Sequence, residues 1–78
     1  MTPIIVTAVH IGGHKLRLTF ADGKVGDIDL AQELWGEMFE PLKDIEIFKR
    51  FRIDKELRTI VWPNGADLAP EYLYLTAA

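Results

Sequence analysis

The sequence predicts one small α+β domain over residues 1–78, built around an antiparallel sheet of about five strands. In the first third of the chain, apolar and polar residues alternate between glycine-containing turns, which is typical of antiparallel strands. The rest passes from helical spacing to a second strand-like pair and then to a proline-initiated helix. Hydrophobic residues make up 49% of the chain and charged residues 27%, which is the composition of a folded domain.

The first two strands are expected at residues 4–10 and 15–20. The first segment is β-branched and apolar, and Gly12 and Gly13 then interrupt it. The second alternates apolar with polar residues, so one of its faces should be buried. Because the first segment is apolar at nearly every position, we expect it to be a central strand covered on both faces, or a strand buried at an interface.

A third strand is expected at residues 27–30, after a tight turn at 21–23 that contains the required glycine. Acidic residues then recur at helical spacing between residues 30 and 42, opposite a cluster of apolar residues. This pattern predicts a short helix or 3₁₀ turn, which Gly36 and Pro41 keep short.

The clearest helix signal begins after Asp44, a residue type that favours the N-cap position. Ile47 and Phe51 are spaced i, i+4, and Ile45 and Phe48 are spaced i, i+3, so these side chains should share a buried stripe.

The final third predicts a hairpin and a last short helix. Residues 52–54 and 58–62 are expected to pair across residues 55–57, and Pro70 suits the first turn of a helix. We expect the inner side of that helix to carry Leu68, Tyr72 and Leu75. The face of the sheet should be packed by Phe48, Phe51, Leu34 and Tyr72.

Residues 62–68 read Trp-Pro-Asn-Gly-Ala-Asp-Leu and predict a turn at Pro63, Asn64 and Gly65. Nearby backbone amides are expected to satisfy Asp67. Asn64 and Asp67 beside Trp62 are also the residues that would line a small ligand pocket, but the turn accounts for them more simply.

This segment, with residues 39–42, 51–54 and 70–74, resembles the bacterial family called domain of unknown function 2442. The opening strands are similar too, so the resemblance covers nearly the whole chain. It implies a small α+β domain with no assigned activity. It also implies a paired gene for another small protein, as in suspected toxin–antitoxin modules. The candidate interaction residues are Trp35, Phe39, Trp62, Pro63, Asn64, Gly65, Asp67 and Pro70.

The chain contains no cysteine and no serine. These absences exclude thiol and serine nucleophiles, thiolate metal sites and disulfides, and we predict no catalytic residue. His10 and His14 would hold a metal only on a shared face. If Gly12 and Gly13 form the loop, however, both rings are exposed and point to opposite sides, so we predict no metal and no cofactor.

Three acidic residues, Asp22, Asp27 and Asp29, lie close together in the sequence and are the other candidates for Mg²⁺ or acid–base chemistry. No helix start, lysine or hydroxyl accompanies them in a pattern that binds phosphate or sugar. Alternation with apolar residues already explains them as the solvent face of a strand.

Charge is uneven along the chain: residues 22–46 carry a net charge of −6 and residues 47–58 carry +3. The basic group is a solvated face or a weak phosphate-contacting patch. Direct nucleic-acid binding is disfavoured because the net charge of the protein is −3. The members of the basic group are Lys49, Arg50, Arg52, Lys55 and Arg58.

An irregular segment contains Trp35, Met38 and Phe39, which we expect to cover the core in preference to meeting a partner. Residues 1–6 lack the charges and length of a signal peptide or spanning helix, so we expect a cytoplasmic protein without membrane contact. The function we predict is that of a non-catalytic module that binds a small partner protein, with an antitoxin-like role in a two-gene module. The alternatives are a homo-oligomeric structural domain and, less favoured, a nucleic-acid-associated accessory domain.

Overall fold

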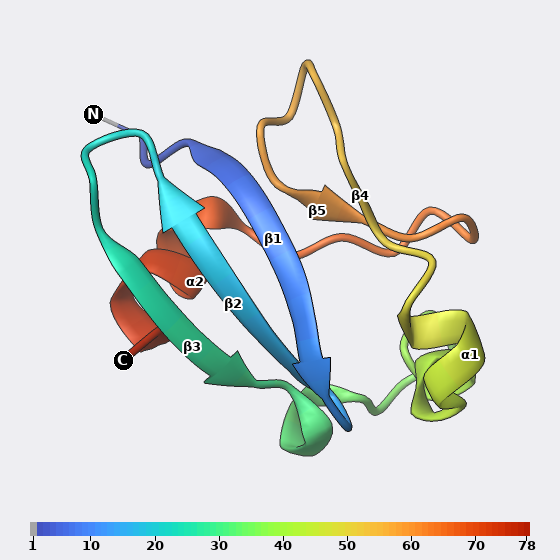
Figure 1. Cartoon of the computed structure of the whole chain (residues 1–78). Coiled ribbons are helices and arrows are strands. Elements are labelled where there is room, and N and C mark those ends of the chain that lie inside the picture. Colours follow the sequence, from blue (N-terminus) through green and yellow to red (C-terminus); the bar gives the residue numbers. More distant parts are fainter. Residues whose placement is uncertain (1) are drawn as a thin grey trace.

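The computed structural model describes residues 2–78, so Met1 of the predicted domain lies outside the described residues. Five strands form two antiparallel sheets beside short helices (Figure 1), which confirms the α+β class, the strand count and the element order. The first sheet contains β1 (Ile5–Gly12), β2 (Lys15–Phe20) and β3 (Val25–Asp29) in that order. The second pairs β4 (Arg52–Ile53) with β5 (Ile60–Val61).

The first sheet has one buried and one solvent-exposed face, as the alternation in β2 predicts. Leu16, Leu18 and Phe20 are fully buried, while Arg17 on the other face is exposed. The C-terminal helix α2 (Pro70–Thr76) lies across the buried face behind β2 (Figure 1).

Helix α2 presents a different face from the predicted one. Leu73 is completely buried, whereas Leu75 is 83% exposed and Tyr72 is only half-buried. The prediction for Leu75 is wrong because the stripe that packs on the core contains Leu73 and Ala77, spaced i, i+4, and this rotation turns Leu75 toward solvent.

Strand β1 lies at the edge of its sheet, so the prediction of a central strand covered on both faces is wrong. A register shift between Ile5 and Thr7 follows the buried Ile5, and Val6 and Val9 are each more than half exposed. The apolar run therefore faces both the core and solvent.

The outer edge of β3 is closed by the end of the chain. Ala78 exchanges two backbone hydrogen bonds with Asp27, at 2.9 and 3.0 Å. Ala77 packs so closely on Gly26 that a Cβ atom at Gly26 would lie 2.9 Å from the Ala77 Cβ. A glycine in this strand therefore permits the close approach of the C-terminus.

The middle of the chain forms two 3₁₀ turns, η1 (Ala31–Glu33) and η2 (Glu40–Lys43), and the single-turn helix α1 (Ile45–Phe48). The carboxylate of Asp44 accepts a hydrogen bond of 2.9 Å from the Glu46 amide, which confirms the predicted N-cap.

The β4–β5 connection is fixed by local hydrogen bonds. Asp54 Oδ2 accepts from the amides of Glu56 and Leu57, and Arg58 adopts a left-handed conformation with φ of 58°. The carbonyl of Arg58 in turn accepts a hydrogen bond from the Ile5 amide, which ties this hairpin to the start of β1.

The core joins both sheets to α1 and α2. Phe48 and Leu34 are buried in it as predicted, and Phe51 and Tyr72 pack against its margin. Within residues 2–78, no helix is long and apolar enough to cross a membrane.

We expect Gly26→Ala to lower the free energy of unfolding by about 1–3 kcal/mol, because the added methyl group overlaps Ala77. Urea unfolding measures the loss. The double variant with Ala77→Gly should recover part of it, since the Cβ atom that the new methyl group meets is removed. Unchanged stability of Gly26→Ala would contradict the close packing of the C-terminus on β3.

Candidate functional site

The Pro63–Asn64–Gly65 segment forms the predicted turn. The Gly65 amide donates to the carbonyl of Trp62 at 2.9 Å, and the Trp62 amide donates to the carbonyl of Ala66 at 2.8 Å. Gly65 has a φ of 90°, which an L side chain rarely adopts. The sequence thus specifies a tight loop at the end of β5.

Asn64 joins this loop to the irregular segment before η2. Its Oδ1 atom accepts from the Ala66 amide at 3.0 Å, and its Nδ2 atom donates to the carbonyl of Met38 at 2.8 Å. Gly65 also lies beside the Met38 side chain. Two segments 26 residues apart are therefore held together by one amide side chain.

Trp62 and Phe39 belong to the core side of this site. Trp62 is 1% exposed, and its indole N–H donates to the carbonyl of Phe48 at 2.8 Å. Phe39 is half-buried with its ring edge-on to Trp62, the centroids being 6.5 Å apart. Both rings therefore contribute to the core rather than to an exposed contact surface.

Asp67 and Pro70 lie in the segment that leads from this loop into the first turn of α2. Asp67 is exposed, and its carboxylate makes no hydrogen bond with the residues that the structure describes, so the expectation that nearby amides satisfy it is wrong. The side-chain Oδ1 atom of Asn64 accepts the hydrogen bond from the Ala66 amide instead. Pro70 occupies the first turn of α2 as predicted.

Trp35 is 72% exposed and Met38 is 46% exposed, which contradicts the expectation that they cover the core. Only Phe39, the third apolar residue of this segment, packs against the core. The two exposed side chains, named here the Trp35–Met38 surface, lie on a segment fixed by the Asn64 hydrogen bond and by the turn in which the Phe39 amide donates to the carbonyl of Gly36.

The chain segment that carries the Trp35–Met38 surface is acidic. Glu33, Glu37 and Glu40 flank it in the sequence, and no lysine or arginine occurs between Lys24 and Lys43. The Lys43 ammonium lies 3.2 Å from the Glu40 carboxylate and offsets one of these charges.

The five basic residues do not form a free cluster. Lys49 pairs with Glu46 at 3.1 Å, and Arg52 pairs with Asp54 at 3.1 Å. Arg50, Lys55 and Arg58, the other members of the group, are exposed on and before the β4–β5 connection. The ion pairs reduce the positive potential available to a phosphate.

His10 and His14 lie on the same side of the sheet, so the prediction of exposed rings on opposite sides is wrong. A register shift after His10 places Gly13 and His14 in the loop. Both rings then stand edge-on to Phe48, with centroid distances of 6.2 and 4.9 Å. The Nε2 atom of each lies within hydrogen-bond distance of a backbone carbonyl, so both are engaged structurally.

The acidic residues of β3 are also engaged. Arg17 binds Asp27 through two hydrogen bonds of 2.8 and 3.1 Å, which lowers the pKa of that carboxyl. Asp29 accepts from the Ala31 amide at 3.0 Å. Across residues 2–78, no three histidine, aspartate or glutamate side chains are grouped to hold a metal ion.

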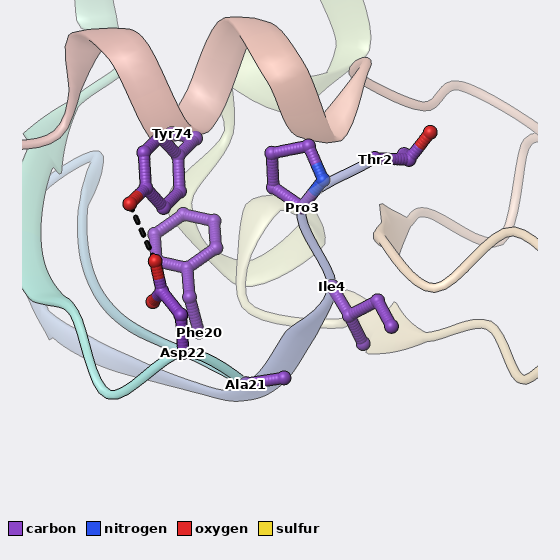
Figure 2. A pocket seen from close by; sticks show the side chains of 7 residues that line it. All are labelled: Thr2, Pro3, Ile4, Phe20, Ala21, Asp22 and Tyr74. Carbon is purple, nitrogen blue, oxygen red and sulfur yellow. Dashed lines mark hydrogen bonds between the residues drawn. The ribbon is translucent and has the colours of Figure 1, made fainter.

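A hollow of about 280 Å³ lies elsewhere, between the N-terminal segment, the β2–β3 turn and α2 (Figure 2). Apolar side chains form most of its wall, and the carboxylate of Asp22 reaches its margin. No local sequence pattern predicts this hollow, because three separate segments meet there and Tyr74 is more than 50 positions from the other lining residues. Its lining residues are Thr2, Pro3, Ile4, Phe20, Ala21, Asp22 and Tyr74.

Asp22 and Tyr74 are joined by a hydrogen bond at the margin of this hollow (Figure 2). The Tyr74 hydroxyl donates to Asp22 Oδ2 at 2.5 Å, and Oδ1 accepts from the Lys24 amide at 2.9 Å. The tyrosine hydrogen bond is the largest cause that lowers the pKa of Asp22, and the same bond raises the pKa of Tyr74. The Asp22 carboxylate is therefore ionised and fixed in position at neutral pH.

Residues 5–77 match the model of one protein family, described as protein of unknown function (DUF2442). This match confirms the resemblance seen in the sequence. The chain matches no curated protein and no solved structure.

We expect the stability difference between the wild type and Tyr74→Phe to be largest near neutral pH. The lowered pKa of Asp22 contributes stability that is present above about pH 4 and is lost as pH falls through the lowered value. The raised pKa of Tyr74 contributes stability that is present below about pH 10 and is lost as pH rises through the raised value.

Urea unfolding of both proteins at about pH 3, 7 and 11 measures this difference at each limit. The stability difference between the wild type and Asp22→Asn should likewise become smaller at the acidic pH. A difference that does not change with pH would show that the hydrogen bond between Tyr74 and Asp22 does not couple to folding.

Proposed function

The chain belongs to the DUF2442 family, and from its exposed Trp35 and acidic surroundings we propose that it is a non-catalytic module that binds a small partner protein. The observation that carries this proposal is the 72% exposure of Trp35 on a segment fixed by the Asn64 hydrogen bond. A large aromatic side chain in water gains much free energy when a partner covers it.

Rigidity supports the same function. Asn64 donates to the carbonyl of Met38, so the Trp35–Met38 surface is attached to the turn that ends β5. A surface that is already ordered loses little conformational entropy on binding. Tryptophan is also among the residues that most often dominate the binding energy of interfaces.

The charges around this surface favour a basic partner. Glu33 and Glu37 flank Trp35, and the stretch between Lys24 and Lys43 contains no positive side chain. We therefore expect a partner that presents an apolar pocket for the indole, rimmed by lysine or arginine residues. An antitoxin-like role in the cytoplasm, with the product of a paired gene as the partner, is the form of this proposal that the family resemblance favours.

A homo-oligomer is the second candidate, and β1 is the observation that favours it. This edge strand contains no lysine, aspartate or glutamate, the residues that commonly discourage pairing between edges, and its Val6 and Val9 are exposed. Light scattering distinguishes the two candidates: a stable dimer of the isolated protein supports pairing through β1, and a monomer excludes it.

We expect Trp35→Ala to weaken partner binding by about 30-fold or more while leaving stability within about 0.5 kcal/mol of the wild type. The partner is found by co-purification of the tagged chain and mass spectrometry, and binding is then measured by calorimetry with the purified components. Leu75→Ala, which truncates another exposed apolar side chain, is the matched control and should bind normally.

Calorimetry at two salt concentrations tests the charge argument, because binding to a basic partner should weaken as salt rises. Equal affinity of the wild type and Trp35→Ala would contradict the assignment of the Trp35–Met38 surface. If none of the purified candidate partners binds at micromolar concentration, the proposed function itself is contradicted.

A further inference from the structure

We propose that the hollow beside Asp22 and Tyr74 binds a small organic ammonium ion with a short hydrocarbon body. This site is separate from the Trp35–Met38 surface and does not depend on the proposed function. The inference is based on three features of the hollow: its shape, the fixed carboxylate at its margin, and the position of the Lys24 ammonium.

The hollow offers an apolar wall to a ligand. Pro3 and Ile4 stand on one side, and the rings of Phe20 and Tyr74 stand on the other, packed edge to face with centroids 4.9 Å apart (Figure 2). A volume of about 280 Å³ is near the lower end of ligand pockets in proteins, which is suited to a small molecule rather than to a peptide.

Asp22 supplies the only ionisable carboxylate among the lining residues. Its two oxygens each accept one hydrogen bond from the protein, from the Tyr74 hydroxyl and the Lys24 amide. Each carboxylate oxygen has a second lone pair, so an ammonium N–H can bind without displacing either protein donor. The two existing bonds orient the carboxylate before the ligand arrives, which reduces the entropic cost of binding.

The positive charge of Lys24 also lowers the pKa of the Asp22 carboxyl, and the position of this ammonium matters for the sign of the ligand. The Lys24 ammonium lies 4.3 Å from the centre of the Tyr74 ring and donates a hydrogen bond to the carbonyl of the same residue. Lys24 does not line the hollow. A bound anion would therefore face Asp22 without direct contact with a positive side chain, whereas a cation would meet the carboxylate itself.

The hydrogen bond between Asp22 and Tyr74 also attaches α2 to the β2–β3 turn. If this hydrogen bond only stabilises the fold, the surrounding hollow should show no preference for the charge of a small molecule. A ligand site predicts a strong preference for ammonium over isosteric neutral and anionic compounds. This difference separates the two interpretations.

The test uses three probes of similar shape: phenethylamine, 2-phenylethanol and phenylacetate. Each is titrated into the ¹⁵N-labelled full chain at neutral pH while amide shifts are followed. We expect phenethylamine to shift the amides of Ala21, Gly23 and Lys24 saturably. The alcohol should bind at least about ten-fold more weakly, because a hydrogen bond to a charged group contributes more than a neutral one. Phenylacetate should leave these amides unchanged.

Two variants locate the effect. Asp22→Asn keeps an acceptor for the neighbouring donors but removes the charge, and it should weaken phenethylamine binding by about ten-fold or more. Asp29→Asn removes an acidic charge that lies outside the hollow, and it should bind as the wild type does. Ala21→Leu adds bulk at the lining and should also weaken binding, so the test remains decisive if Asp22→Asn fails to fold.

Three results would overturn the inference: shifts that do not saturate, equal responses to the three probes, or equal affinities of Asp22→Asn and Asp29→Asn. Trp35→Ala should retain phenethylamine binding, because the Trp35–Met38 surface is separate from the hollow. A protein that binds the amine but no partner protein would therefore support this site while contradicting the proposed function.

Discussion

The hydrogen bond from the Trp62 indole to the carbonyl of Phe48 is the constraint on which the rest of the structure depends. Helix α1 has only four residues, so its last carbonyls have no partners within the helix and need other donors. The buried indole needs an acceptor in turn. One bond of 2.8 Å satisfies both groups and joins the second sheet to the middle of the chain.

Around this bond, the aromatic residues divide into two classes. Phe48 and Phe39 pack on Trp62 and stabilise the core, while Trp35 extends into solvent. Asn64 then links the same turn to Met38, so the exposed segment is positioned by the core that lies beneath it. Trp62 and Asn64, two positions apart in the chain, therefore stabilise the core and position the exposed segment, respectively.

Most predictions from local chemistry were accurate, with Asp67 as an exception. Asp44 caps α1, and Gly65 adopts the positive φ that its turn requires, because both effects depend on residues within a few positions. Expectations about which face a residue occupies were less accurate. A register shift moved the histidine rings to the same side as Phe48, and contact with the sheet turned Leu75 toward solvent.

The sequence by itself determined the α+β class, the order of the elements, the family and the absence of thiol and serine chemistry, because periodicity, turn residues and residue types are local properties. Only the tertiary structure decided that β1 is an edge strand, that Trp35 is exposed, and that Asp22 meets Tyr74 beside a hollow. Those features arise from contacts between segments distant in the chain. Their free energies depend on how the whole core packs, which no short stretch of sequence encodes.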